Sequence, residues 1–180
     1  IFNFYILTLK SYSYERVETV YYYDLFNPKS LYGNYKTYGI RYFRQKKKEE
    51  TFFFELYKFN RSIEKEGILG VAGLYKDWNP NLFTYSAISI GTKTNYLPKF
   101  RIDHEFYYKI GSKKNILLNL GITYINYYNN NKDFTYSYGI VYYANGWNFT
   151  YKKLNINLTP GNLKPINETL SLGIGYEKKY

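Results

Sequence analysis

FRIDHEFYYKI, residues 100–110, decides the fold, because two different faces alternate along it. Every second residue from Phe100 is apolar, aromatic or histidine, whereas most of the residues between them, from Arg101 to Lys109, are charged. A repeat of two is typical of a β-strand, in which successive side chains point to opposite sides of the sheet. Such a strand fits a membrane β-barrel, with its apolar face in lipid and its charges in the lumen. It also fits a soluble barrel of reverse polarity.

The same alternation recurs in three later segments, at residues 116–124, 134–142 and 170–176. In each of them the face opposite the apolar one carries small or polar residues. A small barrel needs such a face, because its interior has little room for side chains. We therefore expect these residues to face lipid: Phe100, Ile102, His104, Phe106, Tyr108, Leu118, Leu120, Ile122, Tyr136, Tyr138, Ile140, Leu172, Ile174 and Tyr176.

Weaker patterns complete the sheet. Further strands are predicted at residues 5–16, 35–44, 51–59, 67–75, 82–91 and 147–158. The last of these changes phase at Lys152-Lys153, which predicts a bulge. The links at 17–32 and 159–167 are long, whereas Asn145-Gly146 predicts a tight hairpin turn.

These segments predict an all-β fold, with one domain over residues 1–180. The expected architecture is a transmembrane antiparallel up-and-down β-barrel of about ten strands. If both ends of the chain face the periplasm, alternate connections should be short, as at 111–114 and 144–146.

The composition is compatible with a barrel. Aromatic residues make up 23% of the chain, with 26 Tyr against 2 Trp, and a ring with a polar tip suits a membrane interface. A coding bias would also raise the number of Tyr residues, but it would not place them at every second position. A membrane-spanning helix needs about 20 consecutive apolar residues, and no stretch of the sequence approaches that length. The chain has no Cys, which excludes disulfides and thiolate metal sites, and no Met, which predicts a removed signal segment or a fragment.

The formal net charge of +11 suits an anionic partner. Many Lys residues stand in predicted turns, as at 46–48 and 113–114. The Tyr residues alternate along nearly every strand instead of forming one platform for bases, so we expect no nucleic acid. The expected partners are outer-membrane lipid and lipopolysaccharide, and the sequence predicts no particular protein partner.

Several segments together resemble the YaiO family of outer-membrane β-barrel proteins. They are Ser11-Tyr12-Ser13-Tyr14-Glu15-Arg16, Leu97-Pro98-Lys99-Phe100-Arg101, Gly121-Ile122-Thr123-Tyr124, the Ser- and Tyr-rich run 135–143, and Gly146-Trp147-Asn148-Phe149. The resemblance covers most of the chain and implies a barrel in the bacterial outer membrane. It implies no established activity, so it carries no catalytic residues over to this chain.

Charged residues on the presumed inner face predict a polar cluster in the lumen. Its expected members are Arg41, Arg101, Asp103, Glu105, Lys109, Lys152 and Glu177. One interpretation is a set of ion pairs that closes a narrow barrel, since buried charges need partners. The other is a polar relay or binding site, in which Asp103 and Glu105 would act as paired carboxylates.

The sequence gives little support for catalysis. Outer-membrane enzymes commonly place a His beside a hydroxyl or carboxylate, because the base must contact its nucleophile. The single His104 shares the face expected to meet lipid. We therefore expect no catalytic residues, no metal and no cofactor, and a non-enzymatic envelope barrel. Two alternatives stay open: an outer-membrane enzyme acting on lipid or peptide at its extracellular rim, and a soluble lipocalin-like ligand-binding barrel.

Overall fold

The computed structural model describes residues 2–8, 15–25, 34–47, 49–62, 64–144 and 146–174. Within them the chain forms one eleven-stranded sheet, in which each strand is hydrogen-bonded to the next one along the sequence. Strands β1 to β11 span Phe2–Thr8, Glu15–Leu25, Asn34–Lys47, Glu50–Arg61, Gly67–Asn79, Leu82–Gly91, Pro98–Ile110, Ile116–Tyr127, Lys132–Ala144, Trp147–Thr159 and Ile166–Ile174. The predicted all-β, up-and-down order is confirmed. In the described part of the chain, no helix is long and apolar enough to cross a membrane.

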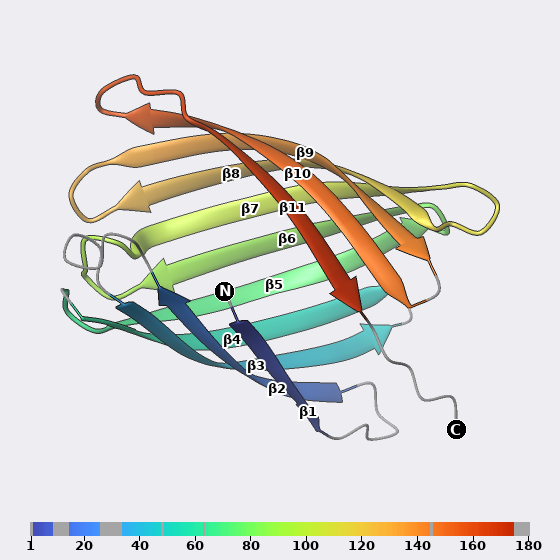
Figure 1. The fold of residues 1–180 in the computed structure, drawn as a ribbon, viewed down its shortest axis with the longest axis horizontal. Helices are drawn as coiled ribbons and strands as arrows, with labels where there is room; N and C mark the ends of the chain where they lie inside the picture. Colours follow the sequence, from blue (N-terminus) through green and yellow to red (C-terminus); the bar gives the residue numbers. More distant parts are fainter. Residues whose placement is uncertain are drawn as a thin grey trace.

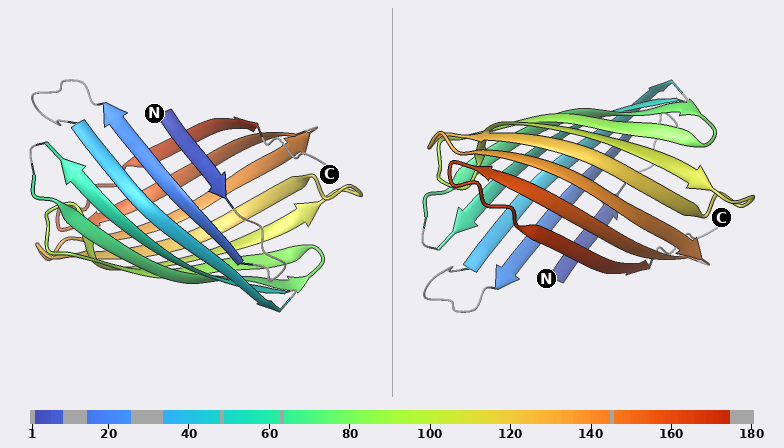
Figure 2. Two further views of the ribbon diagram at one scale, coloured as in Figure 1. Left: turned by 90° about the horizontal axis from the view of Figure 1, so that it is seen from below. Right: turned by 90° about the horizontal axis from the view of Figure 1, so that it is seen from above.

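The sheet curves round like the wall of a barrel. In Figure 1, β1 and β11 lie on the near side, with the middle strands behind them, and Figure 2 shows the same curvature from below and above. No pairing joins β1 to β11 among the described residues, so the two edges stay open there. Neighbouring strands run antiparallel, and therefore β1 and β11 run in the same direction.

The connections differ between the two ends of the strands. At one end β3 stops at Lys47 and β4 starts at Glu50, and the links 80–81 and 145–146 are equally short. Gly111 and Gly146, at this end, have φ of +86° and +84°, which glycine adopts without strain. We call this end the short-turn rim.

The opposite end, the long-loop rim, carries the links 62–66, 92–97, 128–131 and 160–165. Bacterial barrels keep short turns on the periplasmic side and longer loops outside. The expected alternation of connection lengths holds for the links 48–49, 80–81 and 145–146, but not for 111–115, which is as long as 62–66 and longer than 128–131.

The N-terminal assignment from sequence was wrong. A strand was expected at 5–16 and a link at 17–32, but β1 ends at Thr8 and β2 occupies Glu15–Leu25. The run Tyr21-Tyr22-Tyr23 places aromatic rings on both faces of β2, so no alternation of apolar and polar residues marks it as a strand. The count of about ten becomes eleven for this reason.

The bulge expected at Lys152-Lys153 was also wrong. Residues 147–159 of β10 pair with β9 without a register shift. The apolar residues instead move from the outward to the inward face along the strand. Phe149 is exposed on the outward face, whereas Leu154 pairs with Ser137 on the buried side. The register shifts lie near the ends of other strands, between Gln45 and Lys47, Asp77 and Asn79, and Pro98 and Phe100.

The hydrophobic core lies on the concave side of β3 to β6. Phe53 is 1% exposed and packs against Phe43 and Ala87. The Phe53 ring stacks on Tyr85 with centroids 5.5 Å apart and lies 5.4 Å from Tyr75. This aromatic cluster fills the middle of the trough, so the inward face is packed and the outward face carries the exposed apolar residues.

Candidate functional site

Arg41 is the centre of the first polar cluster on the inward face. Its Nε donates to Glu55 Oε1 at 2.8 Å and its Nη1 donates to Glu18 Oε2 at 3.1 Å. The Tyr57 hydroxyl donates to the other oxygen of Glu55 at 2.8 Å. The guanidinium also lies 5.1 Å from the centre of the Phe43 ring, so Arg41 joins three strands to the aromatic core.

The second cluster begins with Arg101 and Asp103, two residues apart on β7. Arg101 Nε and Nη2 each donate to one oxygen of Asp103 at 2.7 Å, which is the bidentate geometry that favours arginine and carboxylate pairs. Thr123 Oγ1 on β8 donates to the same carboxylate at 2.6 Å. Asp103 is only 6% exposed, and these bonds compensate its charge.

Glu105 ties β7 to the more distant β10. Lys152 Nζ lies 2.8 Å from Glu105 Oε1, and the Tyr107 hydroxyl and Asn119 Nδ2 donate to Oε2 at 2.6 and 2.8 Å. Lys152 does not neighbour β7 in the sheet, since β8 and β9 lie between their strands. The ion pair therefore crosses the concave side of the wall.

The two clusters meet around one small hollow of about 230 Å³. Its lining residues are Arg41, Glu55, Tyr75, Tyr85, Arg101, Asp103, Glu105 and Tyr107. We call the ion pairs and the aromatic core together the lumen plug. In the lumen plug, cations, carboxylates and phenol groups lie next to one another. Nearly every charge in the plug therefore has an opposite charge within hydrogen-bond distance.

Most of the residues predicted for the lumen cluster are brought together here, but two are not. Lys109 lies toward the short-turn rim, where its Nζ is 4.0 Å from Asp77 and 5.0 Å from the centre of the Phe83 ring. Glu177 lies outside the described residues. The function of the cluster itself stays a prediction.

Sequence reasoning missed the partners from β2 and β4. Glu18 belongs to the strand that was assigned to a link, and Glu55 stands in a segment dominated by Phe residues. It also missed the inward aromatic residues Phe53, Tyr75 and Tyr85, because the inner face was expected to be small or polar. A signal existed for Glu55, which alternates with the exposed Phe54 and Leu56.

The outward face carries the residues that were expected to meet lipid. Their exposed fractions run from 41% to 63% for Ile102, Phe106, Tyr108, Leu118, Leu120, Ile122, Tyr136, Tyr138, Ile140 and Leu172. Phe100 and His104 are half-buried on the same face. Ile174 ends β11, its side chain lies outside the description, and Tyr176 lies beyond the described residues. That lipid covers this face stays a prediction.

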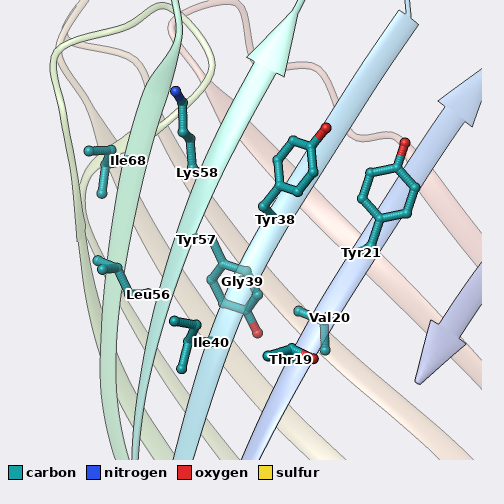
Figure 3. A pocket seen from close by; sticks show the side chains of 10 residues that line it. All are labelled: Thr19, Val20, Tyr21, Tyr38, Gly39, Ile40, Leu56, Tyr57, Lys58 and Ile68. Atoms are coloured by element: carbon teal, nitrogen blue, oxygen red, sulfur yellow. The ribbon is translucent and has the colours of Figure 1, made fainter. Parts of the chain in front are cut away.

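A shallow apolar groove crosses the outward face over β2 to β5. It measures about 640 Å³, and its lining includes Gly39, whose inward side is covered by the side chains of Tyr57 and Val20. Figure 3 shows Tyr38, Ile40 and Leu56 along the groove and Lys58 at one end. Its described lining side chains are mostly apolar or aromatic, with Lys58 as the only charged residue among them.

His104 has a hydroxyl partner that the sequence did not reveal. Ser86 Oγ on β6 lies 2.7 Å from His104 Nδ1, and the two residues face each other across the strand pair. The His104 ring stands edge-on to Phe106, with centroids 4.6 Å apart. In the described residues no carboxylate forms a hydrogen bond or ion pair with His104, so the pair lacks the third group that orients a catalytic histidine.

No metal site is evident in the described residues, since no three or more His, Asp or Glu side chains gather there as ligands. Every Asp and Glu of the lumen plug is instead engaged by Arg, Lys, Tyr, Thr or Asn. An extra cation would have to displace these donors.

Comparison with known families identifies the fold. Residues 14–179 match the YaiO membrane beta barrel domain, so the match spans nearly the whole chain and includes β2 to β11. Comparisons with curated proteins and with solved structures give no match. The resemblance expected from the sequence is confirmed, and a membrane location follows from it. The chain therefore belongs to the YaiO family of membrane β-barrel proteins.

Proposed function

We propose that this chain is a non-enzymatic outer-membrane barrel whose lumen is closed by the plug. The observation that carries the proposal is the ion pair between Glu105 and Lys152, which crosses the concave side at 2.8 Å. Arg41 and Arg101 line the same central hollow on the inward face, which supports the proposal. The role we assign to the protein is binding at the cell surface, and we place the long-loop rim outside the cell.

The plug opposes ion flow because its charges already satisfy one another. A permeating ion must replace hydration by favourable contacts, and a lumen of paired charges and aromatic rings offers few. Separating the partners of a largely buried ion pair leaves charges without compensation, which favours the paired arrangement. The closed state is therefore the stable one.

Conductance in planar lipid bilayers tests this proposal. We expect the refolded chain to show no steady single-channel current. The variant Tyr75→Ala/Tyr85→Ala removes two rings that line the central hollow and should raise the current. Phe54→Ala, on the outward face, serves as control. A large steady current through the unchanged chain would overturn the proposal.

Location and orientation have a separate test. The chain has no Cys, so single cysteines can be labelled without background. In intact cells a membrane-impermeant thiol reagent should label Lys93→Cys at the long-loop rim and spare Lys113→Cys at the short-turn rim. Equal labelling in both variants, or recovery of the protein outside the outer-membrane fraction, contradicts the proposed placement.

Lipopolysaccharide is the membrane partner that the charge pattern favours. Lys36, Lys58 and Lys132 are exposed, lie near the long-loop rim and share the face expected to meet lipid. Cations at the interface attract anionic head groups. We expect the triple change of these residues to Gln to reduce lipopolysaccharide that co-purifies with the protein, whereas Lys113→Gln/Lys114→Gln at the opposite rim should not.

The contact between Ser86 and His104 is the observation that favours a second candidate function, an enzyme that acts on lipid. The pair lies near the middle of β6 and β7, where hydrocarbon and not the ester region of a bilayer is expected. The contact between Ser86 Oγ and His104 Nδ1 gives each side chain a polar partner on the face expected to meet lipid, and this is the role we assign. Release of fatty acid from phospholipid vesicles by the pure protein, lost in Ser86→Ala, would establish the enzyme instead.

A further inference from the structure

Two adjoining hollows lie at the long-loop rim. The first, of about 760 Å³, is lined by residues 64–65, 93–96 and 128–129 of three links at this rim. The second, of about 440 Å³, adds link 160–165. They share the residues Asn95, Tyr96 and Asn129. Both volumes fall within the range of small-molecule sites, which is about 300–1,000 Å³.

The walls of these hollows are held in place by hydrogen bonds. The Tyr96 hydroxyl donates to the Lys65 carbonyl at 2.9 Å, and the Tyr128 hydroxyl donates to the Gly91 carbonyl at 2.8 Å. The Tyr96 ring also lies 3.7 Å from the Arg61 guanidinium. Burial raises the pKa of Tyr96, which keeps its hydroxyl a donor. A preformed wall lowers the entropy cost of binding.

The chemistry of the lining selects for hydroxyl groups. Amide side chains at Asn95 and Asn129 both donate and accept hydrogen bonds, which matches a hydroxyl and not a phosphate. Tyr rings offer apolar faces beside these amides. Charges of both signs line the hollows, Lys65, Lys93 and Glu64 the first and Asp133 the second, but Glu64 is already paired with Arg61 at 3.1 Å.

We propose that the two hollows form one saccharide-binding site. Apolar faces of the sugar rings would lie on the Tyr rings, while their hydroxyls bond to the amides. Asn95, Tyr96 and Asn129 line both hollows, so the site suits a chain of sugars more than a single one. The lumen plug beneath closes the passage, so the site binds its ligand without conducting it.

Calorimetric titration of the full refolded chain in detergent tests the site. The probes are neutral oligosaccharides, maltohexaose and chitohexaose, together with the core oligosaccharide released from lipopolysaccharide by removal of its lipid. We expect at least one probe to bind with a Kd of about 1 mM or lower. No binding of any probe at that concentration overturns the inference.

Variants locate the binding. Tyr96→Ala should weaken it by about tenfold or more, which corresponds to about 1.4 kcal/mol. Tyr96→Phe keeps the ring and should retain most of the affinity, so it separates stacking from a disturbed loop. Asn131→Ala, in the second hollow, should weaken longer probes more than shorter ones. Tyr38→Ala on the outward face is the control, and equal loss there and in Tyr96→Ala contradicts the site.

The source of the saccharide is read from the probes. Preference for the core oligosaccharide indicates lipopolysaccharide of the same membrane, and preference for a neutral glucan or chitin fragment indicates a ligand from outside. Only this step depends on the proposed orientation of the barrel. Binding in detergent and conductance in bilayers are independent measurements, so failure of one leaves the other interpretable.

Discussion

Strands β7 and β11 carry the same alternation of residues, but their inward faces differ in burial. On β7, Asp103 is 6% exposed and bonded on both oxygens, whereas the inward residues of β11, Asn167, Thr169 and Ser171, are all exposed. The difference comes from neighbours, because β7 has a strand on each side and Lys152 across the concave side, while β11 pairs only with β10. Burial in a barrel is therefore set by the opposite wall as much as by the strand itself.

The open edge also has a consequence for closure. An antiparallel seam needs strands that run in opposite directions, and β1 and β11 run the same way. Strand β2 runs opposite to β11, and the family match begins just before it, at residue 14. A seam between β2 and β11 would close ten strands, an even number as in bacterial barrels.

Among substitutions in the packed inward core, the largest loss of unfolding free energy is expected at Phe53. Phe53→Ala removes the most buried ring of the plug and should cost about 3–5 kcal/mol of unfolding free energy. Urea titration followed by gel mobility of unboiled samples measures this. Phe54→Ala changes the same residue type one position away, on the face where Phe54 is 57% exposed. In detergent its effect should be much smaller, and equal effects would contradict the inward core.

Next in size is the loss of Glu105. Glu105→Ala leaves Lys152 without its carboxylate partner and removes the acceptor of Tyr107 and Asn119, so we expect a cost of about 2–3 kcal/mol. The control is Glu168→Ala on β11, which breaks the 3.0 Å pair with Lys153 at the open edge. That carboxylate is well exposed, and its loss should not change the urea midpoint measurably. Similar shifts in both variants would remove the distinction between β7 and β11.

A smaller effect is expected at Gly73, where a methyl group has no room. An added Cβ would meet the Phe53 ring and the Ser86 carbonyl, so Gly73→Ala should cost about 1–3 kcal/mol. At Gly70, on the outward face of the same strand, the nearest atom to an added Cβ is the Ile90 carbonyl oxygen at 4.0 Å. Gly70→Ala should be neutral or slightly stabilising, and the same urea titration compares the two.

These features also define what the sequence could predict. The alternation of Ile102 and Phe106 with Asp103 and Glu105 predicted strand β7 and its two faces, because a repeat of two is a local property. The alternation could not predict the partners of these charges. Glu105 pairs with Lys152, which lies 47 positions away, and this pairing depends on how far the wall curves. For the same reason the alternation could not show that β11 stays uncovered.

The smallest change in stability is expected for a substitution of Ser171 on β11. Its paired residue on β10, Thr150, lies on the same inward side, and Ser171 is exposed. If the lumen is empty there, Ser171→Phe fits without displacing other side chains and should change stability by less than about 0.5 kcal/mol. Gly121→Phe on β8 is the matched contrast, because an added Cβ there already meets Ser137 Oγ and Glu105. A large loss of stability in Ser171→Phe would mean that a closing strand brings side chains against β11. The edge would then be sealed in the membrane, and the contrast with β7 would disappear on closure.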